Sequence, residues 1–201
     1  MISALFVRKR SIYKKLKIDS WDLERDAMQF KGSHPVICHP PCRLWGRLRG
    51  LSKANPKELE TAYFAVKTVQ QNGGILEHPA GSTLWQAAGL PQPGYRDQHG
   101  GYTICIDQSW FGHRARKKTL LYIVGIHQNA LPPIPIKFDT ISHVIGASKR
   151  KKHPGQRLPE VNKTEKEATP EPLAKWLITA AQSIALTRRL KDQHADAYWF
   201  I

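Results

Sequence analysis

Two short apolar runs, each followed by histidine and proline, set the strongest limit on the fold of this chain. The first is HPVICHPPC, residues 34–42, and the second is GGILEHPAG, residues 73–81. Apolar residues with helical spacing lie between them: Ala62, Ala65, Val66 and Val69. We expect this helix to begin with Asn55 as its N-cap and to end at the double glycine. Two buried strands joined by one helix favour a parallel βαβ unit.

Further apolar runs extend this unit into a larger sheet. Strands are predicted at residues 2–7, at a segment ending near Asp22, and at 102–110 and 119–126, and an amphipathic helix is predicted at 172–186. The sequence therefore predicts an α/β fold with a mainly parallel sheet flanked by helices. We assign residues 1–145 to this domain, 146–172 to a mobile basic segment, and 173–201 to a C-terminal helix and tail.

The charge of the chain favours a polyanionic partner. It has 201 residues, with 31 Lys and Arg against 16 Asp and Glu, for a net charge of +15. Such an excess attracts nucleic acid, and we expect DNA as the partner. Candidate DNA contacts are Arg43, Arg47, Lys149, Arg150, Lys151 and Lys152, although the last four also suit a solvated tail. We expect no membrane partner and a cytoplasmic location, because no apolar run approaches the roughly 18 residues of a spanning helix.

Reactive side chains follow the two strands described first. One strand is followed by His39, two prolines and Cys42, and the other carries Glu77 near its end. Because ligands bind beyond the carboxyl ends of parallel strands, we expect Cys42 and Glu77 to face one site. The alternatives are a buried structural thiol and a carboxylate that forms a salt bridge. Cys38 and Cys105 lie inside apolar runs and are predicted to be core residues. We predict no metal site, because Cys38 and His39 point to opposite faces of their strand.

These motifs resemble the cytosine-5 DNA methyltransferases, and more closely the small methyltransferase-like proteins of phages and prophages. The resemblance covers about residues 1–126. It consists of a Pro-Cys dipeptide that ends at Cys42, a strand-end glutamate at Glu77, and an arginine motif before a late strand, with Arg114 and Arg116. The resemblance implies a Rossmann-like methyltransferase-type sheet and an S-adenosylmethionine-dependent enzyme that modifies cytosine in DNA.

The resemblance also implies roles for these residues. Cys42 would add to a ring carbon of the pyrimidine, and Glu77 would act on the ring nitrogen as an acid. The cationic neighbours Arg43, Arg114 and His39 would favour the thiolate. Arg116 completes the set of catalytic candidates. The cofactor candidates are Asp22, Glu24, Phe6 and Pro40, of which Asp22, or Glu24 as second choice, would bind the ribose hydroxyls.

The sequence departs from the family at four points. No glycine-rich loop follows the first strand, and no segment is long enough for a separate target-recognition domain. Arg43 stands where the family has glutamine, and His78 stands where it has asparagine. These departures leave two alternatives open: a noncatalytic DNA-binding or counter-defence protein on a degenerate fold, and another nucleotide modification that uses a different cofactor.

Overall fold

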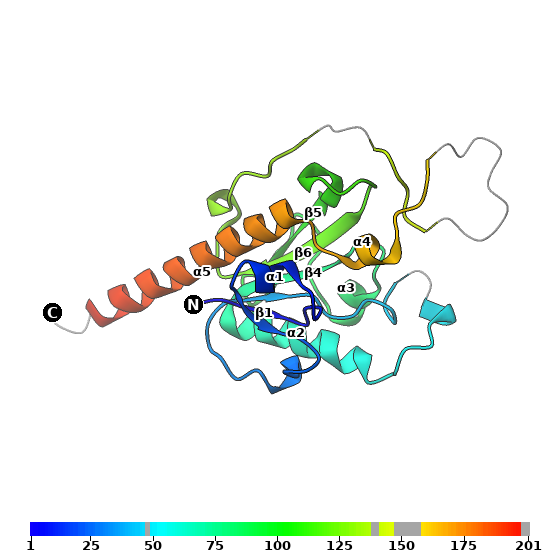
Figure 1. The fold of residues 1–201 in the computed structure, drawn as a ribbon. Coiled ribbons are helices and arrows are strands. Elements are labelled where there is room, and N and C mark those ends of the chain that lie inside the picture. The colour runs from blue at the N-terminus through cyan, green and yellow to red at the C-terminus, as the bar shows by residue number, and fades with distance from the viewer. Residues whose placement is uncertain (47–48, 138–140, 147–157, 198–201) are drawn as a thin grey trace.

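Six strands form one mixed sheet in the computed structural model, which describes residues 1–46, 49–137, 141–146 and 158–197 (Figure 1). The strands are β1 (Ser3–Leu5), β2 (Asp19–Trp21), β3 (Val36–Cys38), β4 (Gly74–Pro79), β5 (Tyr102–Asp107) and β6 (Lys118–Val124), in the order β2-β1-β3-β4-β6-β5. β1 to β4 pair in parallel, whereas β6 runs antiparallel to both β4 and β5. The predicted α/β class and the mostly parallel sheet are confirmed. The antiparallel insertion of β6 was not predicted.

Helices cover both faces of this sheet. They are α1 (Ile12–Lys15), α2 (Glu58–Asn72), α3 (Leu84–Ala87), α4 (Lys163–Glu167) and α5 (Glu171–Ala197), with 3-10 turns η1 (Ala27–Gln29), η2 (Arg49–Leu51), η3 (Gln108–Phe111) and η4 (Gln128–Ala130). Ile37 of β3 packs in one apolar cluster with the first half of α5, and its neighbours Val36 and Cys38 pack in a second cluster with α2 and α3. Successive strand residues point to opposite faces, so a strand buried on both faces is apolar throughout.

The double glycine lets β4 begin directly beside β3. Gly73 ends α2 with a φ of +74°, and Gly74 pairs with Val36. A Cβ built on Gly74 would lie 2.1 Å from the carbonyl oxygen of Val36, so a side chain would force the two strands apart. The pairing continues through Cys38 and Leu76. The reactive residues that follow β3 therefore lie beside those of β4.

The start of α2 differs from the sequence prediction by a few residues. The α-helix begins at Glu58 rather than immediately after Asn55. The preceding turn is held by i→i−3 bonds, including the Glu58 amide to the Asn55 carbonyl at 2.9 Å, and the Asn55 side chain accepts from the Lys57 amide at 3.0 Å. These tighter bonds occupy the first turn before regular α-helical bonding starts. The predicted apolar face of the helix, with Ala62 and Val69, is buried as expected.

The segment expected to lack structure contains an ordered part. Within residues 146–172, α4 forms behind Asn162, whose Oδ1 accepts from the Glu165 amide at 2.8 Å. Arg114 then forms an ion pair with Glu165 from outside this segment. A side-chain cap and a tertiary ion pair thus hold a helix that its few apolar residues did not predict. Residues 147–157 lie outside the described part of the chain.

The C-terminal helix has two different halves. Its first half buries the predicted stripe Leu173, Trp176, Leu177, Ala180 and Ala181 against the sheet. Its second half extends beyond the body of the protein (Figure 1), and Leu186 and Leu190 are exposed there. None of the helices in the described ranges is both long enough and apolar enough to cross a membrane.

Candidate functional site

The order of the strands places the switch point of the sheet at the carboxyl ends of β1 and β3. β2 lies on one side of β1, and the later strands β3 and β4 lie on the other, so the order of the strands reverses between β1 and β3. In open α/β sheets, ligands bind at such a point, outside the carboxyl ends of the strands. Two groups of polar side chains surround it, one at the ends of β3 and β4 and the other after β1 and β2.

The first group is centred on His39 and Glu77. The His39 amide donates to the Leu5 carbonyl at 3.1 Å, which extends β3 by one residue. Pro40 and Pro41 have no amide hydrogen, so the pairing ends there and the chain turns away. His39 thus faces Glu77 on the neighbouring strand, and its Nδ1 lies 3.0 Å from Glu77 Oε2.

Further hydrogen bonds hold both residues. His39 Nε2 lies 2.9 Å from the hydroxyl of Tyr13, which is fully buried on α1. On the other side, Gln108 Nε2 donates to Glu77 Oε1 at 3.1 Å and to Thr119 Oγ1 at 3.0 Å. We call this chain of side chains, Tyr13, His39, Glu77, Gln108 and Thr119, the His39–Glu77 network. It links the connection after β1 to β6 across the sheet.

Glu77 is a carboxylate in this network. Burial alone would raise the pKa of its side chain, but the hydrogen bond and charge of His39, together with the charges of Lys117 and His78, lower that pKa to about 2. Since an ionised carboxylate only accepts hydrogen bonds, His39 carries a proton on Nδ1 and points it at Oε2. Glu77 therefore holds no proton of its own to donate at neutral pH.

Cys42 lies at the same edge but is not activated. Its side chain is half-buried, and both burial and the charge of Glu77 raise the pKa of the thiol, whereas Lys117 lowers it. The cations expected to favour the thiolate have other partners. Arg43 pairs with Glu58, Arg114 pairs with Glu165, and His39 contacts Glu77. The electrostatic effect of Glu77 on Cys42 nevertheless agrees with the expectation that the two face one site.

The other two cysteines differ from each other. Cys38 is buried on the α2 face of the sheet, as predicted, and burial raises the pKa of its thiol. The prediction that Cys105 is a core residue is wrong, because its side chain is exposed. Cys105 lies on β5, the edge strand of the sheet, and on the face where Thr103 contacts Trp85 of α3. An apolar run on an edge strand can leave a residue beyond the covering helices.

His78 occupies the place next to Glu77 but points into the core. It is buried near Trp85, and neither ring nitrogen makes a hydrogen bond to a described residue. Burial lowers the pKa of this imidazole to about 4, although the charge of Glu77 opposes the shift. The Pro41 carbonyl also raises the pKa of His78, although it does not form a hydrogen bond of regular geometry with the ring. His78 is thus neutral at pH 7 and helps to define the electrostatic surroundings of Glu77.

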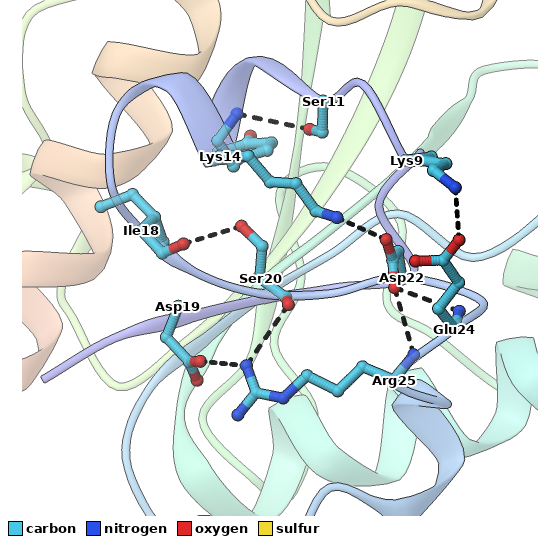
Figure 2. Close-up of polar contacts among 10 residues, drawn as sticks. Lys9, Ser11, Lys14, Ile18, Asp19, Ser20, Asp22, Glu24 and Arg25 are labelled. Carbon is cyan, nitrogen blue, oxygen red and sulfur yellow. Dashed lines mark hydrogen bonds and ion pairs between the residues drawn. The ribbon is translucent and has the colours of Figure 1, made fainter.

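The second group of polar side chains is centred on Asp22, after β2. Figure 2 shows Lys14 of α1 reaching down to this carboxylate, where its Nζ donates to Oδ2. The other oxygen, Oδ1, accepts from the amides of Glu24 and Arg25 at 3.1 and 3.2 Å. The hydrogen bond from Lys14 is the main reason that the pKa of Asp22 is lowered. Glu24 points to solvent and pairs with Lys9 at 2.6 Å.

These contacts bear on the predicted cofactor residues. To bind two ribose hydroxyls, a carboxylate needs free acceptor positions, but both oxygens of Asp22 are already engaged. Phe6 has a φ of +58° and packs against Phe64, and Pro40 is buried. With no glycine between Phe6 and Ser11, the backbone offers no close approach. S-adenosylmethionine therefore does not fit this end of the sheet as the structure has it.

The two arginines of the predicted motif lie on the surface, and the lysine that follows them lies near the site. Arg114 is exposed, and it forms an ion pair with Glu165 and places its Nη1 3.1 Å from His143 Nε2. Arg116 is also exposed. Lys117, which follows them, is half-buried and is the residue whose charge acts on both Glu77 and Cys42. The arginine motif predicted from the sequence therefore ends at Arg116, one residue before Lys117, the cation that acts on the site.

Tyr13 and Gln108 were also missed. Tyr13 lies in a four-residue helix with lysines on its other side, a pattern too short to show which face is buried. Gln108 lies within the strand predicted at 102–110, two residues after Ile106, and a polar residue inside that run was the available signal. Of the predicted DNA contacts, Arg43 is exposed, whereas Arg47 and residues 149–152 lie outside the described residues.

Comparisons with known proteins do not assign the chain to a family. No protein-family model matches it, and no curated protein matches it.

Proposed function

We propose that this protein is a DNA-modifying enzyme of the cytosine methyltransferase type that engages a pyrimidine base between Cys42 and Glu77. One observation carries the proposal: the parallel pairing of β3 with β4 brings a half-buried carboxylate and a half-buried thiol to the same edge of the sheet. Ionisable groups with perturbed pKa values that gather beyond strand ends are typical of functional sites. The mostly parallel sheet supports the finer prediction of a Rossmann-like methyltransferase-type fold.

The chemistry assigned to these residues is addition to the ring. Cys42 loses its proton to solvent and Sγ bonds to the ring carbon next to the one that is modified, which makes that neighbour nucleophilic. The electron pair displaced from the ring carbon–carbon double bond is stabilised when the ring nitrogen receives a proton from the Glu77 side of the site. Lys117 supports the thiolate, because its charge lowers the pKa of Cys42. We assign no step to S-adenosylmethionine, because Lys14 holds the carboxylate that would bind it.

A noncatalytic DNA-binding or counter-defence protein is the second candidate. The ion pair of Lys14 with Asp22 favours it, since this contact occupies the expected cofactor ligand with the chain's own side chain. The raised pKa of Cys42 favours it too, because a protonated thiol is a weak nucleophile. In both candidates the partner is DNA, for which the net charge of +15 is the support.

Two measurements separate these candidates. Isothermal titration calorimetry with S-adenosylmethionine tests whether the cofactor binds at all. DNA that contains 5-fluorocytosine then tests the chemistry, because fluorine blocks the proton loss that releases the adduct. A covalent complex that forms only with S-adenosylmethionine supports the enzyme. DNA binding without cofactor binding and without an adduct supports the noncatalytic protein.

DNA binding itself is expected to depend strongly on salt. If phosphate contacts dominate, affinity falls steeply between about 50 and 200 mM salt. Replacing all four residues 149–152 by serine should reduce the slope of log affinity against log salt by up to about 3.6, because each lost phosphate contact accounts for about 0.9. A gel-shift or fluorescence titration at several salt concentrations measures this. An affinity that does not change with salt would contradict the DNA proposal.

A further inference from the structure

We propose that His39 supplies the proton that Glu77 passes to the bound base, and that Tyr13 holds His39 in the protonation state that each step requires. This inference rests on the proposed function and deepens it, because it assigns the acid step to a relay rather than to Glu77 alone. Tyr13 thereby becomes a positioning residue of the site, a role that nothing in the sequence indicated.

Among the described residues, His39 is the one donor to Glu77 that can release a proton. Oε2 of Glu77 lies 3.0 Å from Nδ1 of His39, and Oε1 accepts from Gln108. An amide N–H is not acidic, so of these two donors only the imidazole can release a proton near neutral pH. The side chains of His39 and Glu77 are 12% and 13% exposed, which gives His39 limited access to solvent for taking up a proton.

Tyr13 suits both states of His39 because a hydroxyl group rotates. When His39 is neutral with its proton on Nδ1, the Tyr13 hydroxyl donates to Nε2 across 2.9 Å. In two other states Nε2 carries the hydrogen: when His39 is doubly protonated, and when it is neutral after releasing the Nδ1 proton. In both states Nε2 donates a hydrogen bond to the Tyr13 oxygen. Tyr13 itself keeps its proton, because burial and the charge of Glu77 raise the pKa of its hydroxyl.

One proton moves from His39 through Glu77 to the base. The doubly protonated His39 transfers the Nδ1 proton to Oε2, and the resulting carboxyl group gives a proton to the ring nitrogen as Sγ of Cys42 bonds to the ring carbon. His39 is left neutral, with its Nε2 hydrogen donated to Tyr13, and Glu77 is left as a carboxylate. Glu77 thus ends as the carboxylate with which the step began, and solvent restores the proton on His39.

Several charged or titratable groups face this relay. Around Glu77 they are His39 after β3, His78 on β4 and Lys117 before β6. His39 faces Tyr13 and Glu77 directly, and its charge also acts on His78. Around Cys42 they are Glu77, Lys117 and Glu167. Because these groups are coupled, the pH profile will show apparent pKa values that belong to the network as a whole.

The relay predicts a bell-shaped pH profile for adduct formation with 5-fluorocytosine DNA. Adduct formation needs the Cys42 thiolate, which high pH favours, and a doubly protonated His39, which low pH favours, so the rate should fall on both sides of an optimum. His39→Gln should slow the reaction by about 10²-fold or more and abolish the fall at high pH. Tyr13→Phe should shift the profile along the pH axis, since the imidazole then loses its Nε2 partner in both protonation states, and an unshifted profile would contradict the role of Tyr13. The exposed His99 and Tyr63 provide the matched controls His99→Gln and Tyr63→Phe.

A second measurement tests the relay without DNA. Nitrogen-15 NMR of the histidine side chains should show that neutral His39 carries its proton on Nδ1, the less common tautomer. A proton found on Nε2 would overturn the relay whether or not the protein is an enzyme. An unchanged fall at high pH in a folded His39→Gln variant would overturn it too. If the wild-type protein forms no adduct at any pH while the Nδ1 tautomer is observed, the proposed function fails and the hydrogen-bonded arrangement stands.

Discussion

The β3–β4 end and the β1–β2 end of this edge of the sheet hold their carboxylates in different ways. Glu77 has a side chain that is 13% exposed, and it is bonded to an imidazole and an amide, side chains that stay in place through the packing of β3, β4 and η3. Asp22 is bonded to Lys14, whose side chain is 39% exposed and reaches the carboxylate from α1. A flexible ammonium group is more easily displaced than an imidazole that is held between two packed side chains. The contacts of the β3–β4 end are therefore preformed, whereas the β1–β2 end must open, by displacing Lys14, before Asp22 could accept a ligand through that oxygen.

The largest effect is expected from the thiol at the preformed end. Cys42→Ser should form no adduct with 5-fluorocytosine DNA and should lose turnover by several orders of magnitude, because a serine hydroxyl is a far weaker nucleophile near neutral pH. Cys105→Ser is the matched control, since Cys105 is exposed on the edge strand away from Glu77, and it should react like the wild type. Mass spectrometry of the denatured complexes measures both. Full activity of Cys42→Ser would show that the preformed end does not contain the nucleophile.

The second largest effect concerns stability in acid. Glu77 has a pKa of about 2 in the folded protein against an ordinary value of 4.5, so its ionisation stabilises the fold at pH values above 4.5. The free energy of unfolding should therefore fall by about 3 kcal/mol as the pH drops from 4.5 toward 2. Urea titrations at a series of pH values measure this change.

Glu77→Gln is the variant that isolates this contribution. It should be less stable than the wild type at neutral pH and should lose most of the pH dependence below 4.5. His78, whose pKa is lowered to about 4, acts in a separate range, because protonation destabilises the fold as the pH falls from 6.5 to 4. A Glu77→Gln variant with the full acid dependence of the wild type would show that the two carboxylates do not differ as described.

The smallest effect is expected at the end that must open. Lys14→Ala frees one oxygen of Asp22 and should strengthen S-adenosylmethionine binding. A partly exposed ion pair contributes about 0.2–1 kcal/mol, so the dissociation constant should fall by no more than about fivefold. Lys9→Ala is the control, because Lys9 pairs with Glu24 at the surface and leaves Asp22 unchanged. Calorimetry measures both variants, and weaker binding by Lys14→Ala would mean that Lys14 belongs to the cofactor site.

Part of this site could be predicted because its signals are local. Val36 to Cys38 are apolar and two prolines follow, so neighbouring residues in the chain are enough to place the end of the strand. The same holds for Glu77, which comes near the end of a short apolar run that begins with two glycines. Parallel strands joined by one helix are usually neighbours, which puts Cys42 and Glu77 at one edge.

The partners of these groups could not be predicted in the same way. Arg43 and Arg114 were expected beside the thiol, but each contacts a carboxylate closer to it in space, Glu58 or Glu165. Lys117 lies near the site instead, because β6 begins directly after it and is inserted between β4 and β5. The residue that a charged side chain contacts depends on which opposite charge the fold brings near, and sequence spacing does not encode this distance.

By itself, the sequence determined the α/β class, the buried faces of α2 and α5, and the edge of the sheet at which Cys42 and Glu77 lie. These features follow from the periodicity of apolar residues and from proline and glycine, whose effects act over a few residues. Only the tertiary structure decided the antiparallel place of β6, the exposure of Cys105, and the hydrogen bond from Tyr13 to His39. Each of these depends on contacts between segments that are distant in the chain, and such contacts exist only once the sheet has assembled.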